Sequence, residues 1–193
     1  MAPSDEVSAA LDRIVQEHRR GPEDPGTADL IRRLRRARSR GYLTVAEFLA
    51  AGRWKSARVS GLMARNRYAR VRRATGAALT ARSERRRIEP LLGLEGVSIP
   101  MASAILTLVD PRRYGVLDIR VWQLLYRAGA VSKTPRGQGF TFEHWNQFLA
   151  IVRGLAKKHR LTTREVERAL FEAHRRGQVG RLYDPPAAIE LRA

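Results

Sequence analysis

Residues 91–127 read LLGLEGVSIPMASAILTLVDPRRYGVLDIRVWQLLYR, and this stretch says most about the fold. Leucines at 91, 92 and 94 end one short helix, and Gly96-Val97-Ser98 makes a tight turn. A second helix runs from Met101 to Val109, and its first small residues let the two helices approach closely. A glycine turn that opens a helix leaves backbone N–H groups pointing outward at the positive end of the helix dipole, which suits a phosphate.

Helical patterns continue on the N-terminal side of this stretch. Apolar residues at helical spacing predict a short amphipathic helix over 5–19, and the prolines and glycines of 21–27 then break the chain. A helix begins near Leu30. Thr44 caps the next one, where Glu47 completes a capping-box pattern.

The rest of the chain is also expected to be helical. Residues 56–81 are interpreted as helix, interrupted or not, and Glu89-Pro90 as a turn. Apolar residues from Phe142 to Leu155 mark a strong helix, and Thr163 opens a last one. Sustained alternation and Asn-Gly hairpins, the signals of strands, are almost absent. The predicted fold class is therefore all-α, with short helices and short connections.

The domain organisation follows from these breaks. We expect an N-terminal amphipathic helix and linker over 1–27, one compact multi-helix domain over 28–176, and a C-terminal tail over 177–193. The chain has 193 residues, of which 44% are hydrophobic, so it is long and apolar enough to bury a core.

Charge is distributed unevenly along the chain. The formal net charge is +18, and residues 31–87 alone hold eighteen Lys and Arg against two acids, whereas residues 1–27 carry a net charge of −3. A GC-rich genome would explain why only four of the 37 basic residues are lysine, but it would not remove the acids. The block predicts binding to nucleic acid, above all double-stranded DNA; an acidic protein or a lipid surface is the alternative.

Several other classes of protein are disfavoured. The chain contains no cysteine, which excludes disulfides, thiolate metal sites and cysteine-ligated iron–sulfur clusters. The four histidines lack metal-ligand spacing and are interpreted as ordinary helix residues. No apolar run is long enough to span a membrane, and no signal peptide or coiled-coil heptad is present. We therefore expect a bacterial cytoplasmic protein, associated with the nucleoid when bound to DNA, with no membrane partner and no indicated oligomer.

Two motifs in residues 91–127 resemble the helix-hairpin-helix DNA glycosylase superfamily. The hairpin of that superfamily reads leucine, any residue, glycine, hydrophobic, glycine, and then leads into a small-residue helix. Residues 94–102 follow this order, with Ser98 in place of the second glycine. Further along, the superfamily has an aspartate in a hydrophobic–Asp–x–x–Val context before another helix, and residues 116–121, VLDIRV, match it with Asp118.

The resemblance implies an activity in base excision repair of DNA damage. Such enzymes flip a damaged or modified base out of the duplex and hydrolyse its N-glycosidic bond. Asp118 would be the catalytic carboxylate, which stabilises the positive sugar of the transition state. The position of the lysine that attacks the sugar in some relatives corresponds to Pro100, which favours a monofunctional glycosylase. No cofactor is expected, except that the hairpin could hold a monovalent cation.

The site residues that we expect fall into two further groups. Contacts with DNA are assigned to the hairpin and to polar side chains around it: Gly96, Val97, Ser98, Met101, Ala102, Lys55, Arg58, Asn66, Arg70 and Arg120. Candidates for the wall of a base pocket, or for a wedge that fills the hole left by a flipped base, are Trp54, Tyr114 and Trp122.

Each of these assignments has a structural alternative. An aspartate before a helix is usually an N-cap, as Asp110 before Pro111 is expected to be, and Asp118 could be one as well as catalytic. Trp54 and Trp122 could cover or fill the core. The rival function is a hairpin-containing DNA-binding module without catalysis, and a third possibility is RNA binding without base removal. The sequence does not indicate which base would be removed.

Overall fold

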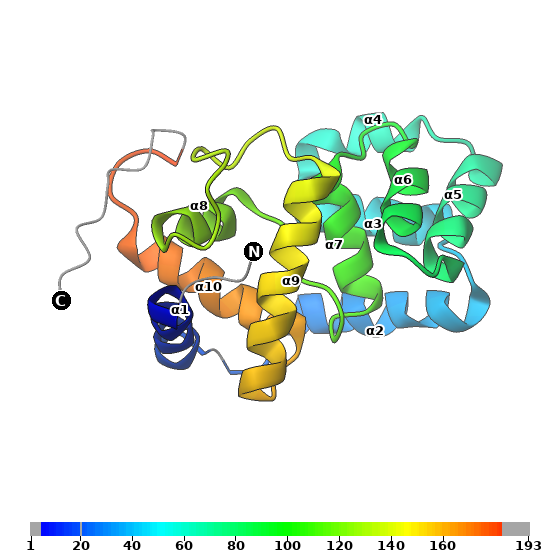
Figure 1. The fold of residues 1–193 in the computed structure, drawn as a ribbon. Helices are drawn as coiled ribbons and strands as arrows, with labels where there is room; N and C mark the ends of the chain where they lie inside the picture. Colours follow the sequence, from blue (N-terminus) through cyan, green and yellow to red (C-terminus); the bar gives the residue numbers. More distant parts are fainter. Residues whose placement is uncertain (1–4, 20, 183–193) are drawn as a thin grey trace. The chain divides into compact units, whose positions relative to one another are not determined.

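The structure, a computed structural model, describes residues 5–19 and 21–182 of the chain. Within these residues every regular element is a helix, so the all-α fold class is confirmed (Figure 1). The helices are α1 (Asp5–Glu17), α2 (Pro25–Arg40), α3 (Val45–Lys55), the short 3₁₀ helix η1 (Ala57–Val59), α4 (Ser60–Ala64), α5 (Tyr68–Thr80), α6 (Glu84–Leu92), α7 (Ile99–Val109), α8 (Ile119–Arg127), α9 (Phe142–His159) and α10 (Thr163–Gly177). None of them is both long and apolar enough to cross a membrane.

The chain divides into two compact units. Unit 1 combines residues 1–20 with residues 117–193, and unit 2 consists of residues 21–116. The boundary between them falls inside the segment 28–176, which was expected to form one domain; that expectation stays a prediction. The last part of the expected tail, residues 183–193, lies outside the described residues.

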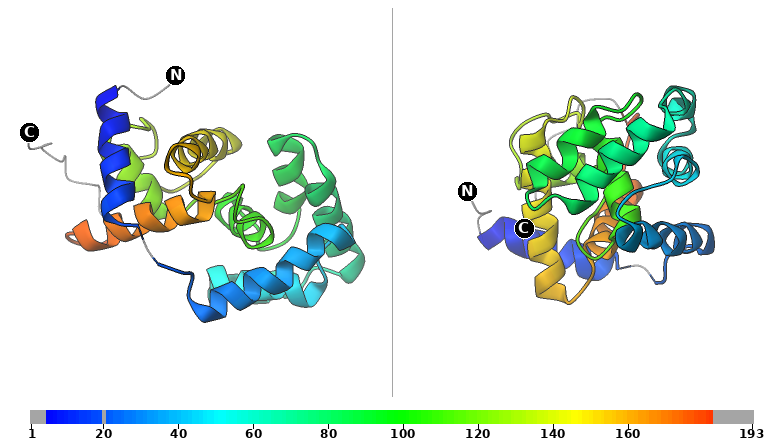
Figure 2. Two further views of the ribbon diagram at one scale, coloured as in Figure 1. Left: turned by 90° about the horizontal axis from the view of Figure 1, so that it is seen from below. Right: turned by 90° about the vertical axis from the view of Figure 1, so that its right-hand side faces the viewer.

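Unit 1 is built around α10. This helix packs against α8, α9 and α1, an arrangement that the left view of Figure 2 lets the reader follow. Its inward residues recur at helical spacing, and Val166 and Leu170 are fully buried. Trp122 of α8 and Trp145 of α9 are the largest side chains of this core, and both are fully buried.

Unit 2 is built around α7. Apart from Pro100, every residue of this helix is buried, because α2, α3 and α6 pack on different sides of it. The helix therefore has almost no polar face, and its only polar side chains, Ser103 and Thr107, donate hydrogen bonds to backbone oxygens of the helix. α5 packs mainly on α6 and so lies one layer further from α7 (Figure 1).

Local capping signals predict the helix starts well. Thr44 and Glu47 form the expected capping box at α3, with the Glu47 N–H 3.3 Å from Thr44 Oγ1 and the Thr44 N–H 2.8 Å from Glu47 Oε2. Thr163 begins α10, as expected. Residues 56–81 prove to be interrupted helix, made of η1, α4 and α5.

Two predicted breaks are placed wrongly. The linker over 21–27 already contains the first turn of α2, since the Asp24 carboxylate accepts the Thr27 N–H (2.9 Å) and Pro25 suits a first helical position. Glu89-Pro90 is helix rather than turn, because both residues lie inside α6. Pro90 is tolerated because α6 ends two residues later, so the hydrogen bond that proline removes belongs to the last turn.

Asp110 is not the N-cap of a helix, contrary to expectation. It is the C-cap of α7, and a three-residue turn follows it instead of a helix. Its backbone oxygen accepts the N–H groups of Arg113 and Tyr114, both at 3.1 Å, and its carboxylate pairs with Arg38 at 3.1 Å. Asp110 therefore ties the end of α7 to α2.

Candidate nucleic-acid interface

The turn between α6 and α7, residues 93–98, is fixed by its own backbone. The Leu94 N–H bonds to the Leu91 oxygen (3.0 Å) and the Val97 N–H to the Leu94 oxygen (3.2 Å). Gly96 has φ +78°, a backbone conformation that residues other than glycine rarely adopt. A Cβ at Gly96 would also lie 3.1 Å from the backbone nitrogen of Met63 and 2.8 Å from its Cγ. Glycine is thus required here both by φ and by the close approach of α4.

Asn66 holds this turn from outside. Its side-chain amide donates to the backbone oxygens of Met63 (3.0 Å) and Glu95 (2.9 Å), and its Oδ1 accepts the Glu95 N–H (3.0 Å). Asn66 is only 4% exposed. The expectation that its side chain contacts DNA is therefore wrong, because burial and these bonds commit the amide to positioning the turn.

Three of the five expected hairpin contacts have buried side chains. Val97, Met101 and Ala102 face the interior of unit 2, and the Ala102 N–H is already bonded to the Ser98 oxygen at 2.8 Å. Their side chains therefore pack in the core, and contact of their backbone with DNA stays a prediction, except that the Ala102 N–H is already used inside α7. Ser98 is exposed, and its hydroxyl makes no capping bond to the first turn of α7. The surface that a ligand can reach at this turn is thus Gly96, Ser98 and the N-terminal end of α7.

Basic side chains lie near the turn in the same unit. Arg70, on α5, is exposed, donates to the backbone oxygen of Gly93, and lies 3.9 Å from the Glu95 carboxylate. Arg58 is exposed on η1 and Lys55 is half-buried at the end of α3, two elements that pack together. The structure therefore attaches Arg70 directly to the turn and places Lys55 and Arg58 on the elements next to α4.

Two of the expected pocket aromatics have structural roles in unit 2. Trp54 is half-buried and its indole N–H donates to Thr27 Oγ1 (2.9 Å), so it joins α3 to α2 as the alternative interpretation expects. Tyr114 is 2% exposed, and its hydroxyl lies 3.2 Å from Glu84 Oε2. The assignment of Tyr114 as a pocket wall or wedge is corrected, because such a ring must reach a ligand.

Asp118 lies at the start of unit 1 and caps α8. Its carboxylate accepts the Arg120 N–H at 3.0 Å, so the N-cap role is confirmed. Trp122, one turn further on, is fully buried: its indole N–H donates to the Lys133 oxygen (3.0 Å) and its ring packs edge-on against Phe140. Trp122 is therefore core and not a wedge, which corrects that assignment.

Arg120 makes contacts inside unit 1. It is half-buried, its guanidinium donates to the side-chain oxygen of Gln178, and it lies 5.7 Å from the centre of the Phe171 ring. These contacts anchor α8 to α10 and to the residues that follow it. The bond to Gln178 uses one of the five N–H donors of this guanidinium, so contact between Arg120 and a phosphate stays a prediction.

A buried polar pair beside Asp118 was missed by sequence reasoning. Gln123 donates to the backbone oxygens of Arg136 (3.1 Å) and Leu182 (2.8 Å), so its Oε1 accepts from His174 Nε2 at 2.9 Å. Burial, followed by the positive charges of Arg127 and Arg120, lowers the pKa of His174 to about 4, against the opposing charge of Asp118. The signal was available, because His174 continues the buried stripe of Val166 and Leu170 at four-residue spacing.

The expected site residues are thus divided between the units. The glycine turn and most of the basic side chains belong to unit 2, whereas Asp118, Arg120 and Trp122 belong to unit 1. Among the described residues, no cluster of three or more His, Asp or Glu is arranged to hold a metal ion. Comparison of the chain with protein-family models, with curated proteins and with solved structures finds no match.

Proposed function

We propose that this protein is a monofunctional DNA glycosylase, which binds duplex DNA, flips out a damaged or modified base and hydrolyses its N-glycosidic bond. The main support is the order of two features along the chain. A rigid glycine turn opens the buried helix α7, and an aspartate follows at the N-cap of α8, in the order found in the helix-hairpin-helix glycosylases.

The DNA-binding part of the proposal rests on unit 2. It holds 20 basic and 8 acidic residues, a formal net charge of +12. The N-terminal end of α7 offers backbone N–H groups and the positive end of the helix dipole to one phosphate. Exposed arginines such as Arg58 and Arg70 add attraction to the phosphates on either side, without reading sequence.

The catalytic part rests on Asp118. Its capping bond to the Arg120 N–H fixes where the carboxylate points. As the bond between the base and C1′ breaks, positive charge develops on the sugar, and a fixed carboxylate stabilises that charge. Water then adds to C1′ as hydroxide, and its remaining proton leaves with the base. Pro100 offers no amine at the turn, so the products are a free base and an intact abasic strand.

The decisive experiment measures release of abasic sites from duplexes that carry alkylated, oxidised, deaminated or bulky bases. Hot alkali converts each abasic site into a strand break. Asp118→Asn is compared with the wild type, because asparagine also caps helices and keeps the fold. The matched control is Asp24→Asn, the same substitution at the N-cap of α2, where the aspartate accepts the Thr27 N–H.

We expect wild type and Asp24→Asn to release one class of base. Asp118→Asn should bind DNA as tightly but release that base at least about 100-fold more slowly, the usual scale for removing one interaction made in the transition state. Equal release by Asp118→Asn and wild type would refute the role of Asp118.

A second candidate function is a DNA-binding module without catalysis. It is favoured by the capping bond of Asp118, which alone accounts for an aspartate at this position. In that case all three proteins bind duplex DNA with steep salt dependence and none releases a base from any substrate in the panel.

A further inference from the structure

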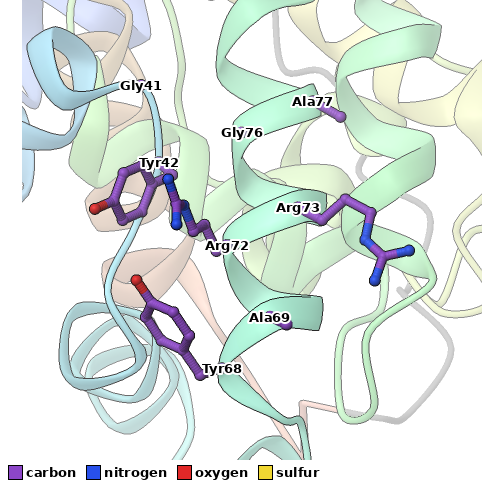
Figure 3. A pocket seen from close by; sticks show the side chains of 8 residues that line it. All are labelled: Gly41, Tyr42, Tyr68, Ala69, Arg72, Arg73, Gly76 and Ala77. Carbon is purple, nitrogen blue, oxygen red and sulfur yellow. The ribbon is translucent and has the colours of Figure 1, made fainter.

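A groove of about 470 Å³ lies in unit 2, between α5 and the loop that follows α2 (Figure 3). Its walls carry two tyrosines and two arginines, Tyr42, Tyr68, Arg72 and Arg73, and no acidic residue. Its size falls in the range of pockets that hold small ligands. The groove is formed by residues that play no part in the glycine turn or at Asp118.

Tyr42 and Arg72 form its fixed side. The guanidinium carbon of Arg72 lies 4.8 Å from the centre of the Tyr42 ring, and that of Arg40 lies 5.1 Å from it. Arg40 is itself held, since it pairs with Glu47 and donates to the Tyr42 backbone oxygen at 3.1 Å. Arg72 has no acidic partner among the described residues, so its charge is positioned but not neutralised.

Tyr68 forms the open side. It is the first residue of α5, and 52% of it is exposed, although a ring of this size normally contributes to a core. Figure 3 shows Tyr68, Tyr42 and Arg72 on one side of α5, with Arg73 directed to the other. Tyr68 and Arg72 thus line the same groove. Single-strand-binding proteins combine exposed aromatic rings, on which unpaired bases stack, with positively charged grooves that follow the backbone.

Gly76 lines the groove on α5 and places no side chain in it. A glycine inside a helix costs about 1 kcal/mol relative to alanine. A Cβ on Gly76 would have its closest neighbour, the Gly41 oxygen, at 3.5 Å, which is an ordinary contact. Packing therefore does not demand glycine at this position, whereas an open groove benefits from it.

We propose that this groove binds one unpaired nucleotide at the end of a DNA duplex, with the base stacked on Tyr68 and the phosphate paired with Arg72. The ligand must be both planar and anionic to satisfy the two walls, and a nucleotide is both. The identification of the ligand as DNA rests on the proposed function. The groove adds a subsite for single-stranded DNA that duplex binding at the glycine turn does not require.

The test compares three DNA ligands by fluorescence anisotropy: a blunt duplex, the same duplex with a short single-stranded overhang, and that duplex with an abasic overhang. We expect the wild type to bind the normal overhang about tenfold more tightly than the blunt end, the effect of roughly one stacked base. The abasic overhang keeps the phosphates but cannot stack, so it should lose most of that preference.

Variants separate stacking from charge. Tyr68→Ala should abolish the preference and leave blunt-duplex affinity unchanged, whereas Tyr68→Phe should keep the preference, because the stacking ring remains. Arg72→Ala should weaken the preference for the overhang. The matched control is Arg36→Ala, which removes an exposed arginine of α2 and should weaken binding of blunt and overhang duplexes equally.

The outcomes distinguish this proposal from the proposed function. If the wild type binds no duplex at all, both fail. If it binds blunt and overhang duplexes equally, or if Tyr68→Ala keeps the preference, the groove proposal is overturned while duplex binding stands. Saturable binding of free deoxyadenosine monophosphate that Tyr68→Ala abolishes, with no overhang preference, would overturn it in favour of a site for free nucleotides.

Discussion

The two units use arginine in different ways. Unit 1 has 17 basic and 11 acidic residues, and it ties several arginines to buried acids: Glu172, 2% exposed, lies 2.8 Å from both Arg175 and Arg176. Unit 2 has the larger surplus of charge, and on α5 neither Arg72 nor Arg73 has an acidic partner among the described residues. An arginine-rich composition thus does not by itself make a binding surface. The absence of local acids is what leaves the charge available to a polyanion.

The largest expected effect is on the free energy of unfolding, and it should differ between one tryptophan of each unit. Trp122→Ala should lower the free energy of unfolding by about 3–5 kcal/mol, because it empties a fully buried site in unit 1. Trp54→Ala should cost about 1–2 kcal/mol, since Trp54 is half-buried and loses mainly its bond to Thr27. Urea denaturation measures both. Equal losses would mean that Trp54 is as much a core residue as Trp122.

Acid should weaken unit 1 through His174. Its pKa is lowered from 6.5 to about 4 in the folded protein, first by burial, so below pH 6.5 the unfolded chain takes up a proton that the folded chain does not. The stability present above pH 6.5 should therefore fall as the pH drops towards 4, by on the order of 3 kcal/mol in all.

Hydrogen exchange, corrected for its intrinsic pH dependence, can localise this loss. Protection in α8 and α10 should fall between pH 6.5 and 4, and His174→Gln should reduce the fall. Asp12 acts outside this window: burial raises its pKa, but hydrogen bonds from Lys158 and His159 lower it overall to below 3.8, so its contribution is lost only at lower pH. A loss of protection that is unchanged in His174→Gln would contradict the assignment to His174.

The salt dependence of DNA binding should differ between matched pairs of arginines. Replacing Arg72 and Arg73 by alanine should reduce the slope of log affinity against log salt by up to about 2, close to one for each phosphate that an arginine no longer neutralises. Replacing Arg175 and Arg176, which pair with Glu172, should change that slope much less, in protein shown to be folded by circular dichroism. The same reduction for both pairs would remove the distinction between paired and available charge.

The smallest expected effect compares two helix glycines. Gly76→Ala in α5 and Gly154→Ala in α9 should each raise the free energy of unfolding by up to about 1 kcal/mol, since neither added Cβ meets a clash. Only Gly76→Ala should also reduce the preference for a DNA overhang, because only that methyl group enters the groove. An unchanged preference would show that the groove tolerates a higher wall at this position.

Helices could be predicted from the sequence where their signals are local. The capping box of Thr44 and Glu47, and the apolar spacing of α9 and α10, involve residues within a few positions of one another. Asp110 and Pro90 were misplaced because each carries a strong local preference that tertiary packing overrides. The carboxylate of Asp110 pairs with Arg38 on α2. Pro90 lies in α6, which packs against α5 and α7.

The site could be predicted only in part, because local signals can be recognised in a sequence whereas tertiary contacts cannot. Asp118 was found from the local motif of residues 116–121, and its N-cap role is also a local feature. The roles of Asn66 and Tyr114 depend on partners 29 and 30 positions away, so their burial could not be inferred from spacing. The groove at Tyr42 and Tyr68 was missed because its two walls are 26 residues apart in sequence and no motif joins them.

The bridge from Asn66 to Glu95 closes a loop that contains the whole of α5 and α6. Closing this loop costs chain entropy, which the packing of the two helices must offset. The native form of the turn before α7 therefore depends on contacts made across 29 positions and not on residues 93–98 alone. A ligand that recognises the backbone of this turn binds the native chain alone, so it stabilises the native state by an amount that grows with the ratio of free ligand to Kd.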